Sequence, residues 1–196
     1  MLDTYLRKIS KDEINELPLK EYTGPIHIIN SLDQIDFALS ILENETLLGF
    51  DTETKPSFKK GQVNLPALLQ LACRDCVILF QLSLISFPSS IKKILADPSV
   101  IKTGVAVKDD IKGLKRLSPF EESAFIDLGD LSRQIGMKTN GLRNLAANLL
   151  GFRISKNTQR SNWERHCLTK RQLIYAATDA WISRELHLCF QRLELL

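Results

Sequence analysis

The stretch Leu47-Leu-Gly-Phe-Asp-Thr-Glu-Thr54 joins an apolar segment to two acidic residues. The charge-free run before the first acid predicts a buried strand over residues 46–51, which ends at Asp51. Residues i and i+2 of a strand point to the same face of a sheet, so we expect Asp51 and Glu53 side by side. Two carboxylates placed there repel each other, and a cation between them would relieve the repulsion. The alternative is a solvated strand end, since exposed acids are common.

Strand and helix signals alternate on both sides of this stretch. Short apolar runs predict strands over residues 26–29, 67–72, 77–81, 100–107 and 125–128. Helices are expected after the capping box Ser31-Leu-Asp-Gln34, after Pro88, over residues 109–117, as a pair ending with 141–150, and after the capping box Thr169-Lys-Arg-Gln172. This order predicts a single α/β domain, with a mixed β-sheet flanked by helices.

Length and composition fit one globular domain. The chain has 196 residues, of which 44% are hydrophobic and 25% are charged. The net charge of +3 excludes a strongly basic coat protein, but it leaves room for a local basic face. We expect residues 1–24, a mixed-charge segment before Pro25, to form an N-terminal extension that is packed on the domain or partly disordered.

The sequence shows no targeting segment. Residues 1–7 lack the apolar core of a signal peptide. The charge-free run of residues 77–91 is shorter than the roughly 20 apolar residues of a membrane-spanning helix. We therefore expect a soluble protein in the cytoplasm or another intracellular compartment, with reduced cysteines.

Two more acidic residues, Asp110 and Asp179, are candidate metal ligands. Asp110 follows Lys108 and Asp109 at the start of a predicted helix, where the alternative is ordinary capping. Tyr175 and Asp179 are four residues apart, so they share one face of the last helix. Because that helix is rich in apolar and small residues, Asp179 should be buried, and a buried carboxylate needs a metal or a cationic partner. The alternative is a pair with an arginine.

In this order the acids resemble the three motifs of the DEDD 3′–5′ exonucleases. The match extends to the flanking segments Pro66-Ala-Leu-Leu-Gln-Leu71, Ser161-Asn-Trp-Glu-Arg165 and Leu168–Ala180, over roughly residues 26–192. The resemblance implies a ribonuclease H-like fold and an exonuclease domain over residues 25–196. It also implies an enzyme that hydrolyses phosphodiester bonds at 3′ ends and releases nucleoside 5′-monophosphates.

The resemblance assigns a role to each position. It implies that Asp51, Glu53, Asp110 and Asp179 hold two divalent metal ions, Mg²⁺ or Mn²⁺, which favour oxygen ligands. It implies that Tyr175 orients the attacking water, which places the chain in the tyrosine branch. The sequence has no thiolate or imidazole cluster beside these motifs, so zinc is not expected. Cys73-Arg-Asp-Cys76 lacks the second pair of a zinc site and is interpreted as a hairpin turn.

The sequence also suggests residues that contact the substrate. In related enzymes the positions of Leu68 and Gln70 and the segment after Glu53 line the path of the 3′ end, and basic residues before the last helix could bind phosphates. The predicted substrate-binding residues are Thr52, Thr54, Lys55, Leu68, Gln70, Arg160 and Arg165. Lys59 and Lys60 extend the basic run of Lys55. For each basic residue the alternative is a solvated surface, and Trp163 is expected in the core.

The motifs favour DNA over RNA as the substrate. Ribonuclease D-like members would have a histidine at the position of Val105, and they carry helical domains after the exonuclease, whereas this chain stops soon after its last helix. The alternatives are a ribonuclease D-like exoribonuclease, an inactive nucleic-acid-binding module and an endonuclease of the same fold. DNA repair, RNA processing and a protein partner such as a helicase stay open.

Overall fold

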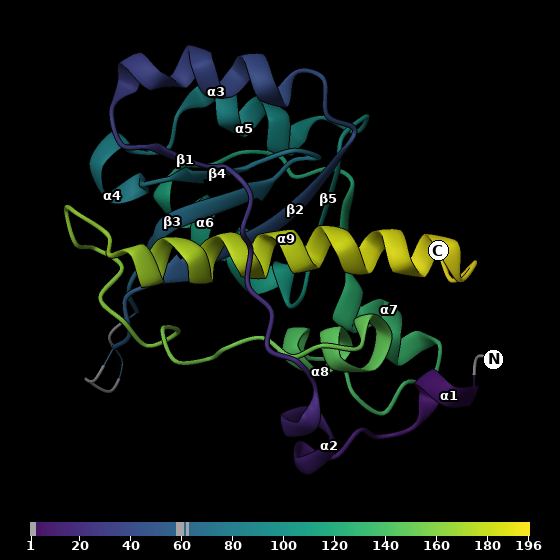
Figure 1. Ribbon diagram of the computed structural model, residues 1–196. Helices are drawn as coiled ribbons and strands as arrows, with labels where there is room; N and C mark the ends of the chain where they lie inside the picture. The colour runs from purple at the N-terminus through teal and green to yellow at the C-terminus, as the bar shows by residue number, and fades with distance from the viewer. Residues whose placement is uncertain (1–2, 58–60, 62) are drawn as a thin grey trace.

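A six-stranded mixed sheet runs through the middle of the computed structural model, which describes residues 3–57, 61 and 63–196 (Figure 1). The strands in spatial order are β1 (Ile26–Ile29), β4 (Val77–Phe80), β3 (Pro66–Ala72), β2 (Leu47–Thr54), β5 (Ile101–Gly104) and β6 (Phe125–Asp127). The β2–β3 and β3–β4 pairs are antiparallel, and the other pairs are parallel. The predicted α/β fold with a mixed sheet is thereby confirmed.

Three helices cover one face of the sheet: α3 (Ile35–Leu42), α5 (Ser89–Ala96) and α6 (Val107–Leu117). Their apolar side chains pack with those of alternate strand residues, Phe50 and Leu69 among them. This alternation leaves the residues between them, such as Asp51, for the opposite face of the sheet.

The opposite face is covered by the long helix α9 (Lys170–Arg192), which lies across β2 and β3 (Figure 1). Small residues form its contact with the sheet, and we call this contact the small-residue seam. It consists of Gly49, Ala176, Ala177 and Ala180. Trp163 is fully buried beside the seam, as predicted. The capping box of Thr169 opens α9.

Several predicted element boundaries differ from the structure, most of them by one or two residues. The strand expected over residues 100–107 ends at Gly104, because Ala106 takes a left-handed conformation (φ 63°) and α6 begins at the next residue. The strand expected to end at Asp51 continues to Thr54. The helix expected over residues 141–150 is α8 (Leu142–Leu145), followed by a π-helical turn, Ala146–Leu150. The short helices η1 (Leu32–Gln34) and α4 (Leu82–Ile85) were not predicted individually.

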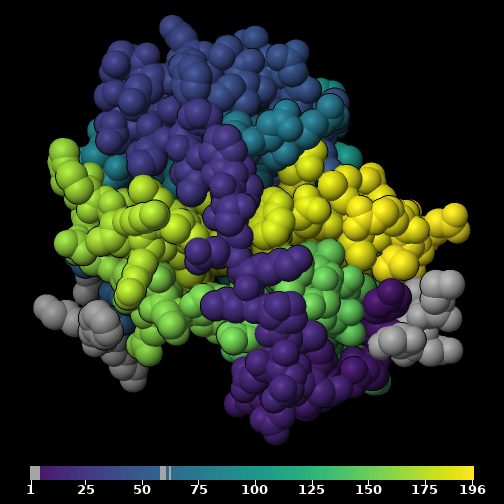
Figure 2. All heavy atoms as spheres, in the orientation of Figure 1, coloured from purple at the N-terminus to yellow at the C-terminus, as the bar shows by residue number. Residues whose placement is uncertain are grey.

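The N-terminal arm, residues 3–24, contains α1 (Asp3–Leu6) and α2 (Lys11–Glu16) and packs on the rest of the chain (Figure 2). The backbone N–H of Lys20 donates to the carbonyl of Arg153 at 2.9 Å. The backbone N–H of Tyr22 donates to the hydroxyl of Thr178 on α9, also at 2.9 Å. The arm therefore crosses the face of α9, although the division of the chain at residue 24 stays a prediction.

Two other expectations concern the chain as a whole. Among the described residues, none of the helices is both long and apolar enough to cross a membrane. The predicted hairpin turn joins β3 to β4, with the backbone N–H of Cys73 donating to the carbonyl of Cys76 at 2.9 Å. All four cysteines are free thiols.

Candidate active site

Three of the predicted carboxylates meet where β2 faces α9. One ligand oxygen from each of Asp51, Glu53 and Asp179 lies within 4.8 Å of the other two. The alternation of β2 places Asp51 and Glu53 on the same face, and α9 brings Asp179 against that face. The side chain of Asp179 is only 6% exposed. The predicted proximity of the two strand acids is thus observed, and the solvated strand end is not.

The electrostatics of this trio are unfavourable without a cation. Burial raises the pKa of Asp51, and the negative charges of Asp110, Asp179 and Glu53 raise it further. Burial and the negative charges of Asp179 and Asp110 raise the pKa of Glu53 to about 9. Burial raises the pKa of Asp179 to about 7, against a hydrogen bond from Tyr175. The protein therefore holds together carboxylates that cannot easily all ionise.

Tyr175 lies one helical turn before Asp179 and is also buried. Burial, followed by the negative charges of Asp179 and Glu53, raises the pKa of its phenol above the ordinary value. Around the metal-free carboxylates the phenol therefore keeps its proton, so it can donate a hydrogen bond and orient a water molecule. It is a poor general base in these surroundings.

The fourth carboxylate, Asp110, lies on α6 close to the trio but outside it. It accepts a hydrogen bond from the hydroxyl of Thr52, which points away from Asp51 on β2. Burial raises the pKa of Asp110 to about 7, and the hydrogen bond from Thr52 opposes the rise. Thr52, Thr54 and Asp110 together line a separate cavity of about 440 Å³.

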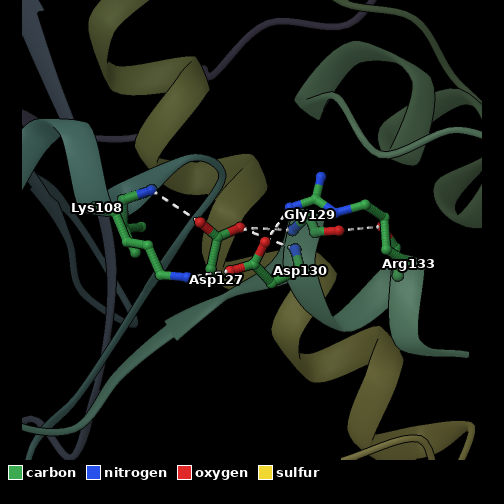
Figure 3. Close-up of polar contacts among 7 residues, drawn as sticks. Lys108, Asp127, Gly129, Asp130 and Arg133 are labelled. Atoms are coloured by element: carbon green, nitrogen blue, oxygen red, sulfur yellow. Dashed lines mark hydrogen bonds and ion pairs between the residues drawn. The ribbon is translucent and has the colours of Figure 1, made fainter.

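The start of α6, which carries Asp110, is held by an acid that sequence reasoning did not single out. One carboxylate oxygen of Asp127 accepts from the backbone N–H of Val107 at 3.1 Å. The other accepts from the N–H groups of Gly129 (2.9 Å) and Asp130 (3.1 Å), which caps α7 (Leu128–Gln134) (Figure 3). Asp127 thereby fixes two helix starts at one end of the sheet.

A cavity of about 290 Å³ opens beside the trio, and we call it the active-site cavity. Asp51, Tyr175 and Asp179 line one part of it. Residues that sequence reasoning did not assign to the site line the rest, among them Arg143, Asn144, Ser155, Lys156 and Gln159. No residue pattern singled out Arg143, whereas Lys156 belongs to the basic run before α9.

The predicted substrate-binding residues are distributed unevenly. Lys55 lies beyond β2 and pairs with Glu164 at 2.8 Å. Leu68 and Gln70 are fully buried under α9, so in this structure neither side chain is accessible to a nucleic acid. Arg160 and Arg165 are exposed, but they are not among the residues that line the active-site cavity. Lys59 and Lys60 lie outside the described residues.

The donor set fits hard divalent cations. Asp51, Glu53, Asp179 and the nearby Asp110 supply carboxylate oxygens, and the described lining of the active-site cavity contains no histidine or cysteine. Mg²⁺ and Mn²⁺ favour such oxygen ligands, whereas zinc sites are rich in nitrogen and sulfur. A bound cation would also offset the mutual repulsion of the acids.

Known proteins resemble this chain in sequence. A family model described as 3′–5′ exonuclease matches residues 26–193. The mouse bifunctional 3′–5′ exonuclease/ATP-dependent helicase WRN is 29% identical over 177 residues, which cover 85% of this chain and 13% of the mouse protein. The chain thus spans a small part of the length of this relative.

Two solved structures share the fold of this chain. The Nibbler EXO domain of Aedes aegypti superposes with a TM-score of 0.77 at 27% identity, over 85% of this chain and 87% of that domain. RNase D of Escherichia coli, an exoribonuclease, has the same fold, with a TM-score of 0.76 at 23% identity over 87% of this chain and 46% of that one. Fold, acidic site and family match agree, and the chain belongs to the DEDD superfamily of 3′–5′ exonucleases.

Proposed function

We propose that this exonuclease removes nucleotides one at a time from the 3′ end of a nucleic acid strand and releases nucleoside 5′-monophosphates. The observation that supports this most directly is the close trio of Asp51, Glu53 and Asp179, two of them buried, which adjoins a cavity lined by Tyr175. In the reaction, water attacks the terminal phosphorus atom. The bond from phosphorus to the 3′ oxygen of the preceding nucleotide then breaks, and that oxygen takes up a proton.

We assign the metal-holding role to Asp51, Glu53, Asp110 and Asp179, with Mg²⁺ or Mn²⁺ as the cation. Two such ions, when bound, stabilise the charge on the attacking and leaving oxygens. Tyr175 acts as a hydrogen-bond donor that holds the attacking water in line. Lys156, which lines the same cavity, supplies positive charge near Asp179 and the phosphate.

DNA is the favoured substrate of this proposal. Val105 lines the active-site cavity, at the position where a histidine would be expected in a ribonuclease D-like site. RNA is the second candidate, and the exoribonuclease fold of the Escherichia coli neighbour is the observation that favours it.

The test is a shortening assay on matched strands. The protein is incubated with MgCl₂ or MnCl₂ and a 5′-labelled single strand, made once as DNA and once as RNA of the same sequence. We expect a ladder that shortens by single nucleotides from the 3′ end, with nucleoside 5′-monophosphate as the product and faster loss of DNA. Faster loss of RNA would reverse the substrate assignment.

Matched variants make the assay specific to the site. Asp51→Asn and Asp179→Asn should each reduce the rate by about a thousandfold or more, because each removes a carboxylate that would hold the metal ions. Asp36→Asn, which changes an exposed acid on α3, should keep the wild-type rate. Undiminished activity of Asp51→Asn, no shortening of either strand, or cleavage of a circular strand would each contradict the proposal.

A further inference from the structure

The N-terminal arm forms one wall of a second cavity, which adjoins the active-site cavity. This arm cavity has a volume of about 730 Å³ and lies between the arm and the residues around α8. Lys8 and Lys11 line it from the arm. Arg143, Asn144 and Lys156 line both cavities, so a strand leaving the active-site cavity on that side meets the arm cavity next.

The lining of the arm cavity is strongly basic. Its charged members are Lys8, Lys11, Arg143 and Lys156, and none of its described lining residues is acidic. Glu13 lies on the same short helix as Lys11, but it is engaged in an ion pair with Arg7 and in the capping box. Four cations around one hollow, with no acid in its described lining, favour a polyanionic ligand.

Two buried polar atoms in this lining lack a partner. The hydroxyl of Thr139, a residue only 6% exposed, finds no hydrogen-bond partner among the described residues, and neither does the buried Nε of Arg143. The guanidinium of Arg143 makes one contact, from Nη2 to Oδ1 of Asn15 on the arm at 3.1 Å. Buried polar groups are almost always paired, so two such groups beside one cavity point to a ligand with acceptor oxygens.

The arm holds its two lysines in a defined place. Ile9 and Ile14 pack against Ala147, and the side-chain amide of Asn148 donates to the carbonyl of Tyr5 at 2.7 Å. Figure 2 shows the arm lying against the segments that follow β6 rather than projecting away from them. Lys8 and Lys11 lie outside the residues matched by the family model, so their contribution comes from this chain's own extension.

We propose that the arm cavity binds the sugar–phosphate backbone of the strand whose 3′ end occupies the active-site cavity. This rests on the proposed function. Lys8, Lys11 and Arg143 contact phosphates upstream of the bond that is cleaved. Phosphate contacts of this kind fix the position of a strand and are independent of its sequence. The arm therefore makes the enzyme favour longer strands over short ones.

The experiment compares strand lengths in an arm variant. Values of kcat/KM are measured for a single strand of twelve nucleotides and for a dinucleotide, in the wild type and in Lys8→Ala/Lys11→Ala. For the longer strand we expect a loss of about tenfold, as two exposed ion pairs would give. The dinucleotide should be cleaved at the wild-type rate. For the longer strand, log(kcat/KM) should fall less steeply with log[salt] in the variant. The slope should become shallower by about 1.4, or about 0.7 for each lost phosphate contact on a single strand.

Two further variants serve as controls. Arg74→Ala/Lys93→Ala removes the same charge from exposed positions on the β3–β4 turn and on α5. It should leave kcat/KM unchanged for both substrates. Lys8→Glu/Lys11→Glu should lower the rate on the longer strand further, with an unchanged melting temperature. Equal effects on the two substrates, or no effect on either, would overturn the proposal.

Binding separates this proposal from the activity itself. The affinity for a labelled twelve-nucleotide strand, measured by fluorescence anisotropy without added metal, should fall in both arm variants even if the wild type cleaves nothing. Absence of cleavage with arm-dependent binding would reject the proposed function and keep the arm cavity. If the protein cleaves the strand but neither binding nor rates depend on the arm, the proposed function stands and the role of the arm cavity is rejected.

Discussion

The carbonyl oxygen of Ala180 on α9 lies 2.0 Å from the place that a β carbon on Gly49 would take. Strand β2 and helix α9 are thus in contact through their backbones, without a side chain between them. Asp51 follows Gly49 by two residues, and Asp179 precedes Ala180 by one. The glycine therefore determines how closely the two carboxylates can approach.

The first prediction concerns Gly49→Ala. The added methyl group must displace α9, because the atom it meets belongs to backbone, and we expect a loss of about 3 kcal/mol or more in the free energy of unfolding. The same displacement moves Asp179 away from Asp51, so kcat should fall as well. Urea unfolding and the shortening assay measure the two effects. The control Gly141→Ala adds a methyl group in open space, so its free energy of unfolding should stay within about 0.5 kcal/mol of the wild type. Equal stability of the two variants would contradict the prediction.

The second prediction is that the metal-free protein loses stability as the pH rises. Glu53 and Asp179 have pKa values of about 9 and about 7 when folded, against ordinary values near 4.5 and 3.8 when unfolded. Between these limits the folded state binds more protons than the unfolded state, so the free energy of unfolding falls with rising pH. The melting temperature measured with a chelator should decline from pH 5 to pH 8.

The variant Asp179→Asn provides the control for this pH effect. Without one of the repelling charges, it should melt above the wild type at pH 8 and show a flatter decline, although we expect it to have lost most of its activity. Adding Mg²⁺ or Mn²⁺ at pH 8 should raise the melting temperature of the wild type more than that of the variant. Identical pH dependences for the two proteins would refute the repulsion that we infer.

The third prediction concerns Tyr175→Phe. Because the raised pKa keeps the phenol protonated, the lost function is water positioning, and kcat should fall by about 10²–10³. KM should change little, and the pH limbs of kcat should stay where they are in the wild type. Steady-state kinetics across pH check this. A variant that loses one limb of the profile would instead identify Tyr175 as the general base.

The fourth prediction concerns Lys102, a fully buried lysine on β5. Its ammonium donates to the carbonyls of Asp97 (2.8 Å) and Ile94 (3.3 Å) at the end of α5, and burial lowers its pKa to about 8. From pH 8 towards 10.5 the unfolded state binds more protons at this residue than the folded state, so its contribution to the free energy of unfolding rises with pH. Urea unfolding of the wild type and Lys102→Met should therefore diverge across this range in favour of the wild type. Lys93→Met, at an exposed position on α5, should follow the wild type, and parallel curves for Lys102→Met would exclude the shifted titration.

Local signals made much of the fold and the acidic trio predictable. The alternation along β2 placed Asp51 and Glu53 on one face, and the capping box of Thr169 marked the start of α9. Burial of Asp179 followed from its apolar and small neighbours along one helix. These inferences depend on residues within one or two turns of each other, where spacing determines geometry.

Features that depend on distant contacts could not be predicted in this way. The start of α6 depends on Asp127, twenty residues further along the chain, which accepts from Val107. Burial of Gln70 depends on how closely α9 approaches β3, and that distance is set by residues far apart in the sequence. The place of Arg143 beside both cavities depends on the arm, whose docking no local pattern described.

The small-residue seam also bears on how such a chain can change over evolutionary time. A larger side chain at Gly49, Ala176, Ala177 or Ala180 would shift the helix that carries Asp179, so few substitutions there leave the chemistry intact. The arm and the segment between α8 and α9 border the cavities without entering the seam. New substrate preferences can therefore arise by mutation of these peripheral segments while the hydrolytic centre is inherited unaltered.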